Sequence, residues 1–150
     1  MSRALVVYHS GTGNTKAMAQ TVAEGIITVA DVEVIWKEAE QASVIDLVDA
    51  DAIAFGSPTY FSYMAGALKT LFDKAWPSRN EIEGKPFVAF TSGAGSQAKS
   101  LQSIESVGAS CGLQKACSGV NCSGDAHRQS ERGVQKPRSC FGQGYKEMRW

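Results

Sequence analysis

Six small polar residues stand between an apolar run and a stretch with helical spacing: Ser10, Gly11, Thr12, Gly13, Asn14 and Thr15. Their three hydroxyls are hydrogen-bond donors, and the glycines let backbone N–H groups approach a ligand closely. A helix that begins at Asn14 adds unsatisfied N–H groups and the positive end of its dipole. Because the loop contains no arginine or lysine, we predict that hydroxyls and backbone dipoles hold a phosphate monoester without a salt bridge.

This loop differs from two commoner phosphate-binding patterns. Lys16 stands where the third glycine of a dinucleotide fingerprint would be, and no Gly-Lys-Ser/Thr sequence follows a glycine at the spacing of a nucleotide P-loop. The alternative interpretation is an ordinary N-capped helix after a turn. Such a cap needs one residue of this kind, whereas the loop offers three hydroxyls.

A second loop follows the apolar run that ends at Phe55, and it contains Pro58, Thr59, Tyr60, Phe61, Ser62 and Tyr63. Three aromatic side chains within four residues at a strand end are costly unless they cover something. A flat and partly apolar ligand would cover them by stacking on their rings. The alternative is a cluster that packs on the core at the entry to a helix, to which Met64 belongs.

A third loop, residues 91–96, follows another apolar run and contains Thr91, Ser92, Gly93 and Gly95. Its small residues permit backbone hydrogen bonds to the edge of a heterocycle. Such glycine-rich turns are common, so this loop is informative only beside the other two. The three loops together predict FMN, because the first suits a phosphate, the second the face of a ring and the third the polar edge of that ring.

Strands and helices alternate along residues 1–110. Continuous apolar runs at 4–8, 52–56 and 86–90 predict buried strands, and the alternation over 32–36 is typical of a strand near a sheet edge. Apolar residues three and four apart predict helices over 14–30, 64–75 and 96–107. This alternation indicates a parallel α/β sheet covered on both faces. Ligands of such sheets bind beyond the carboxyl ends of the strands, where the three loops lie.

Over roughly residues 3–110 the sequence resembles the flavodoxin-like family. Residues 10–15 match that family's FMN-phosphate loop, and residues 58–69 are similar to its branch of tryptophan-repressor-binding-protein type NAD(P)H:quinone oxidoreductases. The resemblance implies a doubly wound parallel α/β fold with five strands in the order 2-1-3-4-5. It implies that Ser10, Thr12, Asn14 and Thr15 hold the phosphate. It also implies that residues 59–63 lie along the isoalloxazine and that residues 91–93 lie on its far side.

The candidate cofactor-binding residues are therefore Ser10, Thr12, Gly13, Asn14, Thr15, Pro58, Thr59, Tyr60, Phe61, Ser62, Tyr63, Thr91, Ser92, Gly93 and Gly95. We expect no catalytic acid, base or nucleophile from the chain, because the flavin carries the chemistry. His9 is interpreted as a structural residue beside the phosphate loop. The spacing of Cys117, Cys122 and His127 fits no zinc pattern, so no metal site is predicted.

Two functions from different classes follow. One is an electron carrier that passes single electrons between redox partner proteins, and the short chain favours it. The other is an enzyme that takes hydride from NAD(P)H and reduces a quinone, and the loop from Pro58 to Phe61 favours it. A third interpretation is a protein with the flavodoxin-like fold that no longer binds FMN. The quinone reductases that the sequence resembles build tetramers with the help of an inserted segment and a longer glycine-rich third loop, and this chain is too short for both. A homo-oligomer is nevertheless left open.

The amino-acid composition limits the classes of molecule that the protein is expected to bind. The 150 residues carry 15 basic and 15 acidic side chains, so the charge balance indicates neither nucleic acid nor an anionic membrane surface as a partner. The apolar run at 4–8 is too short for a signal peptide or a membrane span, and we expect a cytoplasmic location. A chain of this length is expected to form one domain.

Residues 121–150 depart from the pattern, since Val134 and Met148 are their only aliphatic or thioether side chains apart from alanine. A poor fifth strand is expected over 113–120, but no helical period follows where the family has its closing helix. One interpretation is a segment from a shifted reading frame. The other is a tail that orders only on a partner or in an oligomer.

Overall fold

The computed structural model describes residues 1–29 and 31–123, so the predictions for the atypical tail lie outside the described residues. In chain order the elements are β1 Ser2–Tyr8, α1 Asn14–Ile27, β2 Val32–Glu38, α2 Val44–Asp49, β3 Ala52–Pro58, α3 Gly66–Ala75, the 3-10 turn η1 Trp76–Ser78, α4 Arg79–Ile82, β4 Pro86–Gly93, α5 Gln97–Ser110, β5 Gln114–Lys115 and β6 Val120–Ser123.

The strands form one parallel sheet in the order β2-β1-β3-β4, with β5 and β6 both paired to the outer side of β4. β5 lies opposite Pro86 and Phe87, while β6 begins opposite Phe90. Between them the N–H of Ala116 donates to the carbonyl of Phe87 at 2.9 Å. Two short strands in succession therefore fill the fifth position, and the predicted order 2-1-3-4-5 is confirmed.

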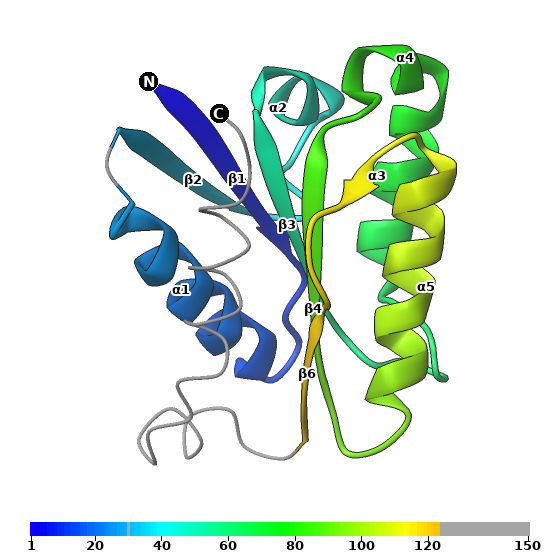
Figure 1. The fold of residues 1–150 in the computed structure, drawn as a ribbon. Coiled ribbons are helices and arrows are strands. Elements are labelled where there is room, and N and C mark those ends of the chain that lie inside the picture. The colour runs from blue at the N-terminus through cyan, green and yellow to red at the C-terminus, as the bar shows by residue number, and fades with distance from the viewer. Residues whose placement is uncertain (30, 124–150) are drawn as a thin grey trace.

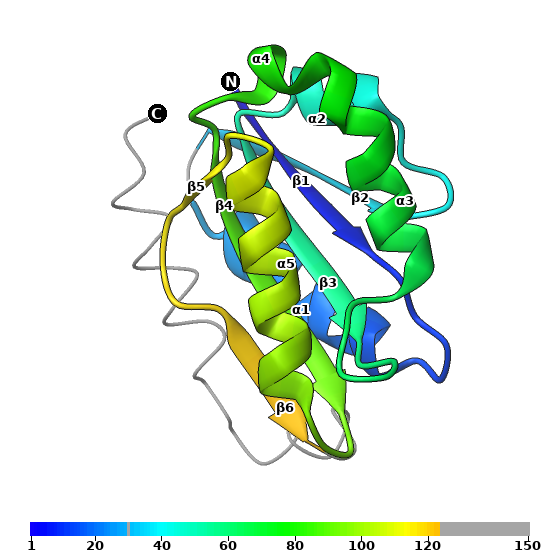
Figure 2. The same cartoon turned by 90° about the vertical axis from the view of Figure 1, so that its right-hand side faces the viewer.

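Helices cover both faces of the sheet, as Figure 1 and the turned view in Figure 2 show. Leu5 and Val7 of β1 point into a core that includes side chains from α2, α3, α4 and α5. Ala4 and Val6 point to the opposite face, where α1 packs. This alternation explains why β1 reads as a continuous apolar run, because both of its faces are buried.

Close packing at the centre of the sheet requires a glycine in β3. A Cβ atom added at Gly56 would lie 2.1 Å from the ring of Phe90 on the neighbouring strand β4. No side chain fits at that distance, so the backbone of β3 and the Phe90 ring can meet only with glycine here. The end of β3 is thereby held beside the end of β4.

The predicted elements over residues 1–113 are present, with shifted ends. Most strands run one to three residues further than their apolar runs, and α1 ends at Ile27 rather than at residue 30. The predicted strand over 113–120 is wrong in detail, because it is split into β5 and β6. The short elements α2, η1 and α4 were not predicted from the sequence. Among the described helices, none combines the length and apolarity needed to cross a membrane.

Candidate functional site

The three loops predicted to bind a ligand lie at the same end of the sheet, drawn lowest in Figures 1 and 2. The parallel register sets Tyr8 opposite Gly56 and Pro58 opposite Ser92, so β1, β3 and β4 end side by side. We name the loops by their residues: the first loop is 9–15, the second is 59–65 and the third is 93–96. Their meeting follows from the parallel topology, since every strand ends at this edge.

The first loop closes on itself through Ser10. The Ser10 Oγ accepts the N–H of Gly13 at 3.1 Å and the N–H of Lys16 at 3.3 Å. Gly13, the residue before α1, has a φ of 97°, a conformation that glycine adopts without strain. Gly11 and Thr12 are exposed. The Ser10 hydroxyl thus accepts hydrogen bonds from backbone N–H groups at the start of α1. The exposed hydroxyl of Thr12 is a further donor in the same loop.

Thr15 takes a different position from Thr12. Its side chain is buried, and its Oγ1 lies 2.9 Å from the Oγ of Ser92 at the end of β4. The two residues are 77 positions apart in the chain. The third hydroxyl of the first loop is therefore tied to β4, the strand that leads into the third loop.

The second loop is a minimal hairpin with an aromatic tip. Tyr60 and Tyr63 each donate their N–H to the other's carbonyl at 3.0 Å. Phe61 and Ser62 between them have φ values of 52° and 62°, as a two-residue type I′ turn requires. Phe61 is fully exposed, and Tyr60 and Tyr63 keep 42% and 40% of their surface exposed. The alternative of a cluster packed on the core does not hold for these three rings.

The second loop also contacts both of its neighbours. The hydroxyl of Tyr60 lies directly over Gly11, where an added Cβ atom would come within 2.6 Å of it. The Tyr60 ring also meets the ring of His9 edge-on, with centroids 6.0 Å apart. On the other side, the side chain of Thr59 packs at 3.0 Å from the position of a Cβ atom on Gly93.

The third loop begins from buried hydroxyls. Thr91 is fully buried, and its Oγ1 donates to the carbonyl of Gln97 at 2.9 Å. Ser92 is 3% exposed. Gly93 is half-buried and Gly95 is exposed, so at these two positions the loop presents backbone and no side chain. That arrangement suits hydrogen bonds between main-chain groups and a polar ring edge.

Acidic side chains border the first loop on the side of β2. Glu40 forms a hydrogen bond with the Nδ1 of His9. Burial raises the pKa of Tyr8 above its usual value, and the nearby carboxylates of Glu38 and Glu40 raise it further. Sequence reasoning did not link His9 to Glu40, because 31 residues separate them and β2 lies between.

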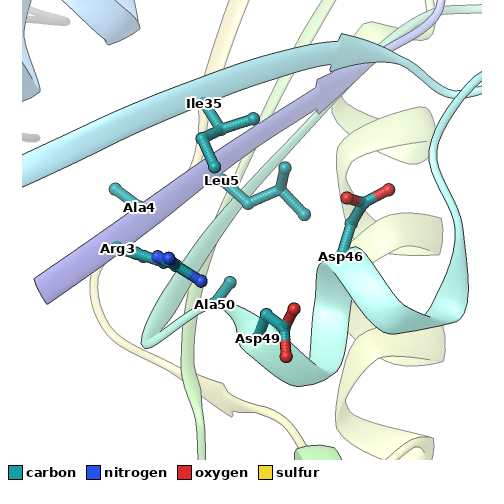
Figure 3. A pocket seen from close by; sticks show the side chains of 7 residues that line it. All are labelled: Arg3, Ala4, Leu5, Ile35, Asp46, Asp49 and Ala50. Atoms are coloured by element: carbon teal, nitrogen blue, oxygen red, sulfur yellow. The ribbon is translucent and has the colours of Figure 1, made fainter.

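A small pocket lies elsewhere, at the amino-terminal end of the sheet. Figure 3 shows its lining of Arg3, Ala4, Leu5, Ile35, Asp46, Asp49 and Ala50. Arg3 pairs with Glu33 at 3.2 Å, and Asp46 pairs with Lys37 at 2.8 Å, so two of its three charged groups already have partners. The pocket lies away from the three loops and contributes nothing to them.

Comparisons with known proteins agree with this geometry. A family model described as a flavodoxin domain matches residues 5–116. A flavodoxin of Aquifex aeolicus is 39% identical over 99 residues, which are 63% of this chain and 52% of the relative. An NAD(P)H dehydrogenase (quinone) of Chromohalobacter salexigens is 34% identical over 131 residues, 69% of this chain and 65% of the relative.

A solved flavodoxin from the domain Archaea superposes with a TM-score of 0.84 at 25% identity, covering 97% of both chains. The alignments with the two curated relatives cover less of both chains than this superposition does. This chain spans between half and two thirds of the length of those relatives.

Proposed function

Because the chain belongs to the flavodoxin domain family, we propose that it binds FMN at the three loops and acts as a redox protein in electron transfer. The observation that carries the proposal is the meeting of three unlike surfaces at one sheet edge. Hydroxyls and a helix N-terminus form the first, exposed aromatic rings the second, and glycine backbone the third.

The first loop fits the phosphate of FMN. Ser10 and Thr12 supply hydroxyls, and α1 begins with Asn14 and Thr15 and has no acidic residue in its first turn to repel an anion. The N–H groups of Gly13 and Lys16, now bonded to the Ser10 Oγ, are further donors at the same place. Neutral donors can hold a doubly charged phosphate, because backbone dipoles and hydroxyls compensate its charge.

The second and third loops fit the ring system. Tyr60, Phe61 and Tyr63 offer exposed aromatic faces for stacking, and Pro58, Thr59 and Ser62 set the hairpin that carries them. Gly93 and Gly95 leave backbone groups accessible for the polar edge. When bound, FMN supplies the electron chemistry, and the chain's residues bind it, orient it and shield its ring from water.

A second candidate function is an NAD(P)H:quinone oxidoreductase of the tryptophan-repressor-binding-protein type. The similarity to a quinone dehydrogenase over 131 residues favours it, as does the aromatic second loop. The two candidates differ in their partners, which are a redox protein in the first case and NAD(P)H with a quinone in the second. A homo-oligomer and a cytoplasmic location stay predictions.

Anaerobic reduction separates the two candidates. The purified chain is reconstituted with FMN, freed of excess flavin and mixed with NADH or NADPH while the flavin absorbance is followed. Retained flavin that neither nucleotide bleaches supports the electron carrier, and rapid bleaching supports the oxidoreductase. A chain that retains no FMN contradicts the proposal as a whole.

A further inference from the structure

Ser92, at the end of β4 and directly before the third loop, makes hydrogen bonds to both the first and the second loop. Its Oγ lies 2.9 Å from the Oγ1 of Thr15 in the first loop. Its carbonyl accepts two hydrogen bonds from Thr59 in the second loop, from the N–H at 2.9 Å and from the Oγ1 at 3.0 Å. Since Ser92 is 3% exposed and Thr15 is 1% exposed, water does not compete for these bonds.

The direction of the hydrogen bond between the two hydroxyls determines whether Thr15 can donate to a phosphate. Each hydroxyl has one hydrogen and two lone pairs, so one member of the Thr15–Ser92 pair donates and the other accepts. A phosphate dianion only accepts. Thr15 can therefore donate to a phosphate only when Ser92 supplies the hydrogen between the two hydroxyls. A donor that also accepts a hydrogen bond is polarised and becomes a better donor.

We propose that Ser92 is a positioning residue for phosphate binding, which donates to the Thr15 hydroxyl and so aims the Thr15 hydrogen at the phosphate. This inference rests on the proposed function, because it assumes that the first loop holds the phosphate of FMN. The hydroxyl of Ser92 acts through Thr15 and not on the ring. Its effect is therefore expected for FMN and absent for riboflavin, which has the same ring and no phosphate.

A double-mutant cycle tests the proposal. FMN and riboflavin are titrated separately, by quenching of flavin fluorescence, into the wild type, Ser92→Ala, Thr15→Val and the double variant. We expect Ser92→Ala to weaken FMN binding about fivefold, as for the loss of one hydrogen bond, and to change riboflavin binding less than about twofold. In the Thr15→Val background the Ser92→Ala change should alter FMN affinity less than about twofold, because the group it acts through is gone.

A matched control removes another buried serine hydroxyl. Ser103→Ala deletes a hydroxyl of α5 that accepts the N–H of Met64 at 3.1 Å and donates to the Ser100 carbonyl at 2.6 Å. It should leave the ratio of FMN to riboflavin affinity unchanged. Circular dichroism checks the fold of each variant. If Ser92→Ala does not fold, Ser92→Cys keeps the size of the side chain with a weaker donor, and a smaller FMN-specific loss is expected.

Three results would overturn the inference. Equal losses for FMN and riboflavin would mean that Ser92 only supports the loops. A full effect of Ser92→Ala in the Thr15→Val background would mean that Ser92 acts independently of Thr15. Unchanged or tighter FMN binding in Ser92→Ala would mean that Ser92 does not aim Thr15. A wild type that binds FMN no better than riboflavin would instead contradict the phosphate site itself, and with it the proposed function.

Discussion

At the scale of single residues, Phe61 combines a strained backbone with an exposed ring. Its φ is 52° and its side chain is fully exposed. A left-handed conformation costs a bulky residue about 1 kcal/mol or more, and no packing in the described structure offsets that cost. Asparagine is favoured at this turn position. We interpret this unfavourable residue at the tip of the second loop as favouring a role for Phe61 in the proposed flavin binding.

We therefore predict that Phe61→Asn raises the free energy of unfolding by about 0.5–1 kcal/mol, because the turn is relaxed and no buried surface is lost. The same change should weaken FMN binding severalfold, since an aromatic face is removed. Urea denaturation and flavin titration measure the two effects. Phe61→Tyr keeps both the ring and the strain, so it should change neither quantity much. A Phe61→Asn variant that is less stable than wild type would contradict this account of the turn.

Residue types predicted the loops but not which hydroxyls face water. Thr12 and Thr15 look equivalent in the sequence, yet Thr12 is exposed and Thr15 is buried. The difference arises because Thr15 lies in the first turn of α1 on the side that faces the sheet, where it meets Ser92. Contacts between residues so far apart in the chain depend on the packing of α1 on β4, which no local pattern reveals.

At the scale of elements, α2 shows what periodicity misses. Its six residues are too few for a helical pattern, and its only local mark is a capping box in which Ser43 and Asp46 each bond the other's backbone N–H. Its other end is held by Lys85, whose Nζ donates to the carbonyls of Leu47, Val48 and Ala50. Distant side chains stabilise this helix, so its sequence alone did not predict it.

The capping box predicts a dependence of stability on pH. Burial tends to raise the pKa of Asp46, but hydrogen bonds from Lys37 and Ser43 outweigh it and hold that pKa below the ordinary value of 3.8. The folded state thus binds this proton less readily than the unfolded state. The stabilisation is complete above the ordinary pKa and is lost as the pH falls through the lower folded value.

Accordingly, Asp46→Asn should lower the free energy of unfolding by about 1 kcal/mol at pH 7, as for the loss of a helix cap. The difference from wild type should shrink as the pH falls below 3.8 and through the lower pKa of Asp46 in the folded state, where its carboxylate becomes protonated. Urea denaturation at several pH values measures it. Glu24→Gln, which removes an exposed carboxylate of α1, is the control. A deficit in Asp46→Asn that persists unchanged in acid would show that charge is not involved.

At the scale of the whole molecule, the order of the strands was predicted from the resemblance to the flavodoxin-like family, whereas the apolar patterns indicated only which strands are buried and which lies at an edge. The continuous runs of β1, β3 and β4 lie inside the sheet, and the alternating β2 lies at its edge. The fifth position was harder to predict, because the small residues Ala116, Cys117, Ser118 and Gly119 separate β5 from β6 and leave no continuous strand pattern. That the three loops meet at one edge of the sheet followed from the topology, since parallel strands bring the loops at their carboxyl ends together.

Because all three loops belong to one sheet edge, FMN binding should stabilise the entire fold. A ligand present at about 100 times its dissociation constant adds about 2.7 kcal/mol to the free energy of unfolding. For a chain of this size that corresponds to a rise of about 5–10 °C in Tm. Thermal unfolding followed by circular dichroism, with and without FMN, measures the shift.

A comparison of the rise in Tm between FMN and riboflavin, in the wild type and in a variant of the first loop, tests where the phosphate binds. Riboflavin at the same concentration should give a smaller rise in Tm, because it lacks the phosphate that the first loop holds. Thr12→Val combined with Thr15→Val should reduce the rise with FMN to that with riboflavin, since two of the three hydroxyls of the loop are removed. Equal rises for FMN and riboflavin in the wild type would show that the first loop does not bind the phosphate, whatever the rings of the second loop contribute.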